Sequence, residues 1–489
     1  RVSRGLGDVY KRQVYDWTAS TSDYDEKMSL CIGSNTIPEI MNVNATQYRA
    51  LLKYDMIQPL DKYFDDYASD ALKSYVKSGG EELQKCITNE DGELMAIPAP
   101  NLTAGGVNEM WIRQDWLDAL GLDVPRTWDE LAEVAKAFVT RDPDGNGEND
   151  TIGILGPGNS DHMNAVGGNQ FGLDPLFSCF QSYPQYWLKS EDGSVEYGSI
   201  QPETKTALEN ISKLYADGVI DPETLVRSDS KEPLLAGKVG IFFGPWWCAY
   251  TFADTTLSGS ADWRAYFTPL SEDGKYYTHM AEPTTQYVVA SKDCKNPEAA
   301  FKIINYIVAN EQKWVEEGVT STEMGTGDFY PLYNTYDNAD EIEKSYEALT
   351  KYLAGDISMD DVDFSTHKLL KNDMEAVTKL KKKPYDDFSL KYWNLDSDLA
   401  KTNLPRLVAI MVGDAPLVNE EYVPVYNAYN GQTETMEAKW ANLKKMEEET
   451  FAKIIMGKAD ISEFDTFVKN WKNQGGDQIL KEINDELSK

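Results

Sequence analysis

The chain has 489 residues, more than one compact core normally holds, so we expect at least two lobes. Its 81 acidic side chains against 47 Lys and Arg give a net charge of −34, which argues against nucleic acid or an anionic lipid surface as a direct partner. Hydrophobic residues make up 41% and charged residues 26%, as in ordinary globular proteins, and no apolar run is long enough to span a bilayer.

The first 13 residues, RVSRGLGDVYKRQ, are basic, unlike the acidic chain that follows. Their last six, DVYKRQ, correspond to one reading frame of a common sequencing adapter, so we treat residues 1–13 as an assembly artefact. A natural signal peptide and lipid-attachment cysteine would then be missing from this sequence. Its N-terminus therefore does not indicate the cytoplasm.

The segment up to residue 100 predicts a short helix followed by a strand-like run near Leu30–Gly33 and a polar loop at Asn42–Thr46. ELMAIPAP (Glu93–Pro100) has an apolar centre interrupted by prolines, which is typical of the end of a strand.

The clearest pattern lies between residues 110 and 138. Met110–Ile112 predicts a strand, and Gln114–Leu120 a short helix that Gly121 ends. Thr127, with Glu130 three residues later, forms a capping box at the start of another helix. The apolar face of that helix is Leu131, Val134, Ala135 and Phe138.

Strands and helices continue to alternate further along, which predicts α/β lobes. We expect strands within Ala236–Trp247 and Gln286–Ser291 and a helix opening at Asn296-Pro297-Glu298. Further helices are expected over Glu203–Asp217 and 432–456, and around the stripe Phe464, Phe467, Val468 and Trp471.

Five cysteines that are far apart and form no CxxC pair argue against a disulfide framework or a zinc site. We expect each to be an isolated core residue. They are Cys31, Cys86, Cys179, Cys248 and Cys294.

The acidic stretch at residues 142–153 has the ligand spacing of an EF-hand-type calcium loop. Oxygen donors occupy positions one, three, five, seven and nine, and Gly147 supplies the sharp turn at position six. The donors are Asp142, Asp144, Asn146, Glu148 (through its carbonyl) and Asp150. Position twelve is Gly153 in place of the usual glutamate, so we expect weak, structural Ca²⁺ binding. The alternative is a turn that holds no metal.

Twelve Trp and 28 Tyr offer rings that stack on sugars, although a single Trp is more often a core residue. Trp246-Trp247 follows an apolar strand and a Gly-Pro break, and two adjacent indoles on a loop are not easily both buried. Strand ends are where α/β proteins bind ligands. The other ligand candidates are Trp111, Trp393, Asn44, Asn101 and Glu282.

The segments WIRQDWLDALGL, PRTWDEL and AFVTRDPDGNGENDTIGI, with GKVGIFFGPWW and NPEAAFKIINYIV, resemble the family-1 extracellular solute-binding lipoproteins of ABC importers, of the Gram-positive gut type. The resemblance covers nearly everything after residue 13. It implies a type II periplasmic-binding-protein fold, in which two α/β lobes joined by a multi-crossing hinge close on a ligand. It also implies that Trp246 of Gly244-Pro245-Trp246 stacks on a sugar, and that residues 142–150 hold structural calcium.

On this basis we expect lobe 1 to contain 14–110 and 284–330, and lobe 2 to contain 111–283 and 331–489. The expected function is capture of an oligosaccharide and its delivery to ABC permease subunits, without chemistry. The protein would be an extracellular, monomeric lipoprotein that touches the membrane only through its N-terminal anchor. The alternatives are a glycoside-active enzyme, which needs two carboxylates about 5–9 Å apart, and a binding protein for peptide or another small solute.

Overall fold

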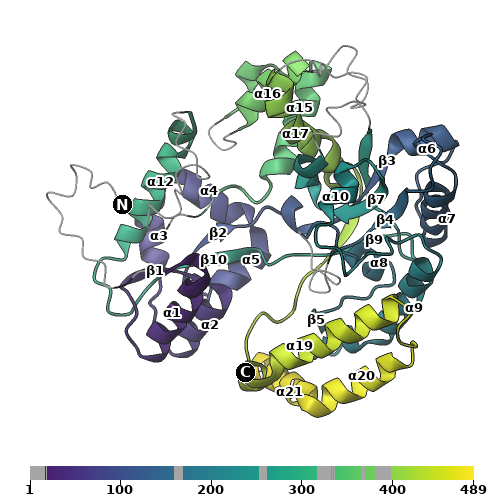
Figure 1. The fold of residues 1–489 in the computed structure, drawn as a ribbon. Coiled ribbons are helices and arrows are strands. Elements are labelled where there is room, and N and C mark those ends of the chain that lie inside the picture. Colours follow the sequence, from purple (N-terminus) through teal and green to yellow (C-terminus); the bar gives the residue numbers. More distant parts are fainter. Residues whose placement is uncertain are drawn as a thin grey trace.

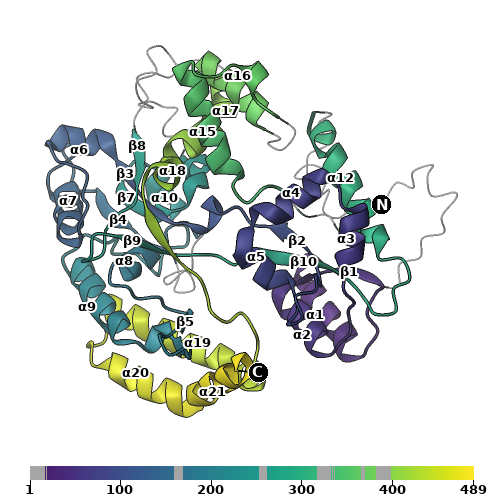
Figure 2. The same cartoon turned by 180° about the vertical axis from the view of Figure 1, so that it is seen from behind.

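The protein is described here by a computed structural model that covers Trp17 and residues 19–158, 169–252, 261–316, 332, 334, 336–364, 369–380 and 398–488. Over these residues it is a mixed α/β structure with two larger sheets and two strand pairs. Figures 1 and 2 show the two larger sheets in opposite halves of the molecule.

The first sheet has three antiparallel strands in the order β1–β10–β2. They are β1 (Ile40–Asn44), β10 (Thr284–Ala290) and β2 (Ile97–Pro100). The helices of this half are α1 (Thr21–Gly33), α2 (Ala45–Lys53), α3 (Asp61–Tyr67), α4 (Asp70–Ser78), α5 (Gly80–Ile87) and α12 (Glu298–Glu316). Leu51, Leu72, Leu83, Val288 and Phe301 share one buried core, so segments far apart in sequence form this half together.

The second sheet has the order β4–β7–β3–β8, with β4 parallel to β7 and the other pairs antiparallel. Its strands are β4 (Ile152–Leu155), β7 (Val239–Gly244), β3 (Glu109–Arg113) and β8 (Trp263–Tyr266). Every residue of β3 and β7 is buried, because neighbouring elements cover both faces of the sheet. The nearby helices are α6 (Gln114–Leu120), α7 (Trp128–Thr140), α8 (Asp174–Ser178), α9 (Pro202–Ala216) and α10 (Lys231–Leu235).

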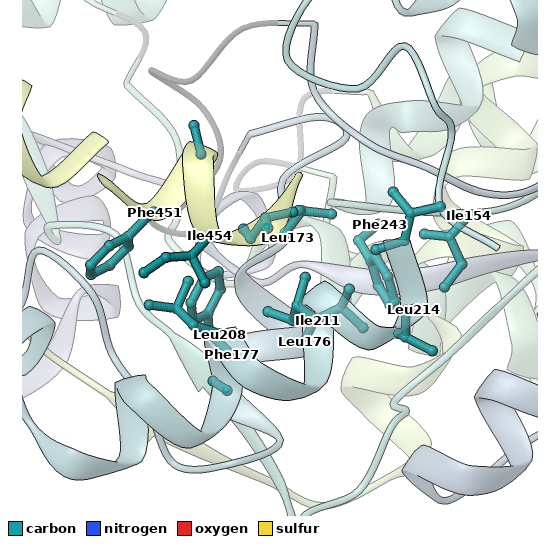
Figure 3. Close-up of a cluster of buried hydrophobic side chains, with 14 of the residues drawn as sticks. Ile154, Leu173, Leu176, Phe177, Leu208, Ile211, Leu214, Phe243, Phe451 and Ile454 are labelled. Carbon is teal, nitrogen blue, oxygen red and sulfur yellow. The ribbon is translucent and has the colours of Figure 1, made fainter. Parts of the chain in front are cut away.

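Two helical groups flank the second sheet at opposite ends of its half (Figures 1 and 2). One contains α15 (Glu341–Ala354), α16 (Leu370–Leu380), α17 (Asp398–Val408), the π-helix η8 (Ala409–Gly413) and α18 (Ala415–Asn419). The other contains α19 (Glu434–Ile455), α20 (Glu463–Trp471) and α21 (Asp477–Leu487). Figure 3 shows Phe451 and Ile454 of α19 in the cluster with Leu208 and Ile211 of α9, so the C-terminal group is part of the core beneath the second sheet.

In the described ranges three segments connect the halves: residues 101–108, from β2 to β3, residues 280–283, from β9 (Tyr276–His279) to β10, and residues 336–340, which lead from the core of the first sheet into α15. They lie side by side, since the Asn101 N–H donates to the Pro283 carbonyl at 2.8 Å and the Thr103 N–H donates to the Ala339 carbonyl at 2.8 Å. The Met280 N–H donates at 2.9 Å to the carbonyl of Val425, the last residue of β11 (Tyr422–Val425), which pairs in parallel with β9. A third strand thus braces the crossing. The remaining strands, β5 (Trp187–Lys189) and β6 (Val195–Tyr197), form a pair beside α21.

Most of the predicted elements are confirmed, with bounds shifted by one or two residues. The capping box of α7 is present, with Thr127 as N-cap and Glu130 at the third position. Gly121 ends α6 with a left-handed φ of 64°. The predicted core position is confirmed for Cys31, Cys179, Cys248 and Cys294, which are buried, and is wrong for Cys86, which is partly exposed.

Two predictions near the N-terminus are wrong. Leu30–Gly33 is the last turn of α1 and not a strand, because its apolar residues belong to a longer helix whose N-cap is Ser20. Asn42–Thr46 is not a loop: it contains the end of β1 and the first residues of α2, because Asn44 caps that helix.

The predicted lobe boundaries stay a prediction, and two residues near them are placed differently. Met110, assigned to the first lobe, lies in β3 of the second sheet. Tyr336, assigned to the second lobe, is buried in the core of the first sheet. No helix in the described ranges is both long enough and apolar enough to cross a membrane.

We predict that Gly240→Ala lowers the free energy of unfolding by about 1–3 kcal/mol. Gly240 lies in β7 where an added Cβ would collide with the buried ring of Phe138 on α7. The matched control is Gly33→Ala at the end of α1, where an added Cβ meets nothing within 4 Å. Urea unfolding of both variants checks the prediction, and equal midpoints would contradict it.

Candidate functional site

A cavity of about 530 Å³ lies between the end of β7 and strands β2 and β10 of the first sheet. Its aromatic wall is Trp246 and Trp247, in the 3-10 turn η5 (Trp246–Cys248). Its polar lining is Asn101, Gln286, Asn334 and Asp337. The rest is formed by residues 99–102, 105 and 106 and by Ala281. Residues from both halves therefore meet around one cavity.

The chain turns into η5 because Pro245 directly follows β7 and cannot donate a ladder hydrogen bond. The end of η8 then packs against the new turn. A Cβ at Gly413 would lie 2.6 Å from the Trp246 carbonyl oxygen and 2.9 Å from the Trp111 ring, so only glycine allows this approach. The position of Trp246 is thus fixed by a backbone contact with a distant helix.

The two indoles differ in exposure. Trp246 is only 5% exposed, and its Nε1–H has no hydrogen-bond partner in the described part of the chain. Trp247 is partly exposed. The expectation that these two rings are not both buried is therefore met: Trp246 is buried and Trp247 is partly exposed. An unpaired buried N–H costs about 1–3 kcal/mol, so an acceptor on a ligand or a water would be favourable beside Trp246.

The amides of the cavity are held by specific partners. Asn42 on β1 donates through Nδ2 to the Asn334 Oδ1 at 2.9 Å. Asn101 donates through Nδ2 to the carbonyl of Glu282 on the neighbouring crossing segment at 2.8 Å. Gln286 is half-buried on β10, opposite Asn44 in the strand register. The amide wall is therefore preorganised by the first sheet and the crossing.

A buried polar cluster holds the crossing segments where they enter the second half. Asn108 donates through Nδ2 to Asp174 Oδ1 at 2.7 Å, and the Tyr276 hydroxyl donates to the Asn108 carbonyl. His279 Nδ1 lies 4.0 Å from Asp174 Oδ2, too far for a hydrogen bond. Burial raises the pKa of Asp174 to about 8 and lowers the pKa of His279 to about 3, so this is a neutral pair and not a salt bridge.

Several residues proposed from the sequence lie away from this cavity. Trp111 is fully buried in the core, with its ring parallel to that of Phe242. Asn44 is the N-cap of α2, and its side chain also donates to Asp25 at 3.1 Å. Trp393 lies outside the described residues.

Glu282 lines a second, larger cavity of about 910 Å³ between α2, α5 and α19. Its Oε2 is 3.8 Å from Arg49, and burial raises its pKa although Arg49 opposes the shift. We take the 530 Å³ cavity as the candidate site because it lies at the carboxyl end of a buried strand and contains both adjacent indoles.

The sequence predicted Trp246, Trp247 and Asn101 as ligand contacts, and the structure brings all three to one cavity. It did not single out Gln286, Asn334 or Asp337. Gln286 lies in a predicted strand, and its place as the polar residue before the apolar run Tyr287–Ala290 is the one sequence signal for it. Asn334 and Asp337 follow a stretch without periodicity, so no local pattern pointed to them.

The acidic loop after α7 curls as the calcium hypothesis requires. Asp142 (φ 46°), Gly145 and Gly147 all have positive φ. The Asp142 carboxylate accepts the N–H groups of Asn146 at 3.1 Å and Gly147 at 3.0 Å. Asn146 Nδ2 donates to Asp144 at 2.8 Å and Asp150 at 3.3 Å, which directs the side chains toward one another.

The negative charges in this loop favour a bound cation, although the Lys238 ammonium competes for Asp150. Burial and the neighbouring Asp142 and Asp150 raise the pKa of Asp144. The Lys238 ammonium, 2.8 Å from Asp150, lowers the pKa of that carboxyl. The donors are of the type that Ca²⁺ prefers. In the described part of the chain, however, no three His, Cys, Asp or Glu are grouped to hold a metal, so calcium stays a prediction.

The profile of the bacterial extracellular solute-binding protein family matches residues 14–314, more than half of the chain. The chain belongs to this family. The α/β solute-binding-protein fold that the sequence predicted is therefore confirmed.

Three proteins illustrate what this solute-binding protein is similar to. The fructooligosaccharide ABC transporter substrate-binding protein FusA of Streptococcus pneumoniae is 30% identical over 246 residues, 47% of this chain and 43% of FusA. The polygalacturonan/rhamnogalacturonan-binding protein YtcQ of Bacillus subtilis is 24% identical over 469 residues, 94% of this chain and 82% of YtcQ. A solved HMO-binding, ABC-transporter-associated protein of Bifidobacterium longum infantis has a TM-score of 0.57 at 18% identity, covering 95% of this chain and 90% of its own.

We predict that Asp174→Asn makes the solute-binding protein relatively more stable as the pH rises. The native carboxyl keeps its proton up to about pH 8, whereas the unfolded chain loses it near pH 4. The contribution of Asp174 to the free energy of unfolding of the wild type is thus present in full below pH 4 and is lost as the pH rises to about 8. Urea unfolding should show that the free energy of unfolding of the variant, relative to that of the wild type, rises by more than about 1 kcal/mol between pH 5 and pH 8. Asp66→Asn, an exposed site on α3, is the control, and parallel pH profiles for wild type and Asp174→Asn would refute the prediction.

Proposed function

We propose that this solute-binding protein is the substrate-binding component of an ABC importer and that it captures an oligosaccharide in the 530 Å³ cavity. The observation that carries the proposal is the pair Trp246-Trp247 facing amides of the opposite half across one cavity. Indole faces stack on the C–H faces of sugar rings, while amides bind hydroxyls. The carbohydrate ligands of the relatives FusA and YtcQ support a carbohydrate ligand for this chain.

Binding without chemistry fits the cavity better than glycoside hydrolysis. A glycosidase needs two carboxylates about 5–9 Å apart on either side of the scissile bond. Among the described lining residues Asp337 is the one acid. Peptide or another small solute is the remaining alternative cargo.

The partners of this function are the transmembrane subunits of an ABC permease, which would receive the sugar from the closed form. A ligand shifts an open–closed equilibrium only by its differential affinity for the two states, so delivery requires contacts from both halves. We place the protein outside the cell as a monomer, held at the membrane by an N-terminal lipid anchor.

We further propose that residues 142–150 bind structural Ca²⁺ through Asp142, Asp144, Asn146, Asp150 and the Glu148 carbonyl. The inward-directed side chains and the positive-φ turns support this assignment. An EF-hand also occurs in the relative FusA. When bound, the ion would neutralise the repulsion among the three aspartates and fix the link between α7 and β4.

We predict that Trp247→Ala weakens binding of the oligosaccharide by about fivefold or more, because one stacked ring contributes about 1 kcal/mol beyond its buried area. The ligand is found first by thermal shift against a glycan panel, since a ligand that binds the native state raises Tm. Calorimetry then compares the variant with wild type.

The control is Trp440→Ala, which removes a partly exposed indole from the 910 Å³ cavity. Its affinity should stay at the wild-type value. Equal losses of oligosaccharide affinity in both variants would rule out the 530 Å³ cavity as the binding site. Release of sugar from the glycan mixture would favour a hydrolase instead.

We predict that millimolar Ca²⁺ raises the Tm of the chelator-treated protein by at least about 1 °C and that Asp144→Asn abolishes this rise. The control is Asp192→Asn, in an acidic turn where the carboxylate is hydrogen-bonded to Ser194. Melting that does not respond to calcium or chelator would identify the loop as a metal-free turn.

A further inference from the structure

We propose that the 530 Å³ cavity selects uncharged oligosaccharides and discriminates against those that carry uronic acids. This inference rests on the proposed function and narrows its substrate class. It starts from the chemistry of the lining, which consists of two indoles, three carboxamides, one carboxylate and short apolar or backbone segments. None of the described lining residues is Lys or Arg.

A uronate brings a carboxylate that must leave water when the ligand is enclosed. A buried charge is tolerated only when it is paired and hydrogen-bonded, and arginine is the usual partner of a carboxylate. The three amides satisfy sugar hydroxyls, which both donate and accept, but an amide N–H carries no compensating charge. The one ionisable group among the described lining residues, Asp337, is an acid, so it offers no positive charge to a uronate.

Two arginines of the second half, Arg113 and Arg406, are each bound to an aspartate. Arg113 of β3 is 4% exposed, and its guanidinium donates to both Asp115 oxygens, at 2.8 and 2.5 Å. Arg406 of α17 makes an equivalent two-point contact with Asp373, with distances of 2.8 and 2.9 Å. Turning either cation toward a ligand would break a two-point ion pair, and turning Arg406 would leave the buried Asp373 without this partner, which is costly.

The ionisable side chains behind the aromatic wall, Glu109 and Asp414, are also acids, and burial raises the pKa of both. Glu109 lies opposite Gly244 in the β3–β7 register, and Asp414 directly follows Gly413, which packs on Trp246. Both are fully buried, and their carboxylate oxygens have no hydrogen-bond partner in the described residues. This second layer supplies no positive charge for an anionic ligand.

The inference separates this chain from YtcQ, although the two align over 94% of the chain. The ligand of YtcQ, polygalacturonan/rhamnogalacturonan, contains galacturonic acid and is therefore an anion at neutral pH. If the cavity lining decides specificity, overall similarity does not transfer that ligand class.

The test measures affinities of the full chain for glycan pairs that share ring configuration and linkage and differ by a carboxylate. Suitable pairs are β-1,4-mannotetraose with β-1,4-mannuronate tetramer, cellotetraose with its C6-oxidised form, and xylotetraose with and without a methylglucuronosyl branch. Fructo-oligosaccharides and galacto-oligosaccharides extend the neutral set. Calorimetry at physiological salt should identify a neutral glycan that binds. Its uronate counterpart, and the other uronates of the panel, should bind at least tenfold more weakly than this neutral glycan.

Each outcome decides one of the two proposals. A uronate that binds within tenfold of the best neutral glycan, or more tightly, overturns the inference and leaves the oligosaccharide-binding function intact. A panel in which no glycan binds overturns the proposed function, and the inference with it.

A charge-introducing variant tests the cause of the selectivity. Gln286→Lys places an ammonium group in the lining and should reduce the neutral-to-uronate affinity ratio at least threefold. Gln286→Met, of similar length and uncharged, should not reduce it. Asp337→Asn is a second probe that should shift the ratio in the same direction as Gln286→Lys, and unchanged ratios in both variants would refute the charge explanation.

Discussion

The hydrogen bonds between the crossing segments 101–108 and 280–283 set how the two halves meet around the cavity. Asn101 is bound to its neighbour twice, by its N–H to the Pro283 carbonyl and by its side chain to the Glu282 carbonyl. Where the segments enter the second half, the Asn108–Asp174 contact is buried, and the raised pKa of Asp174 shows how costly its charged form would be there. Hydrogen bonds therefore fix the crossing segments at both ends, and the amides and indoles can face each other across the cavity.

The aromatic wall depends on backbone packing more than on the indoles themselves. Pro245 ends β7, the turn η5 places Trp246 and Trp247 side by side, and Gly413 allows η8 to press on the Trp246 backbone. One ring is then almost enclosed and the other partly open. This division gives Trp246 a structural role beside its proposed binding role, whereas Trp247 can contribute surface to a ligand without holding the core together.

Local signals predicted a large share of the fold and a smaller share of the site. The capping box at Thr127, the left-handed Gly121 and the apolar stripes need only neighbouring residues, and these were read correctly. The end of a strand before Gly-Pro likewise pointed to Trp246. By contrast, Asn334 reaches the cavity through its contact with Asn42, 292 residues away, and no local pattern encodes such a pairing. The prediction that Trp111 contacts the ligand is not supported, because Trp111 lies in β3, a strand that is buried on both faces. The sequence does not show that a second layer covers this strand.

The two cavities on either side of the crossing are mechanically linked. Ala281 lines both of them, so the segment that forms the floor of one is also a wall of the other. If the halves rotate about this segment to narrow the 530 Å³ cavity, the space between α2 and α19 must widen. The contact between Arg49 and Glu282, 3.8 Å apart and partly exposed, is weak enough to rearrange during that motion at little cost. Closure would then be governed mainly by what the ligand gains between the indoles and the amides, which is why a described lining without Lys or Arg matters for selection.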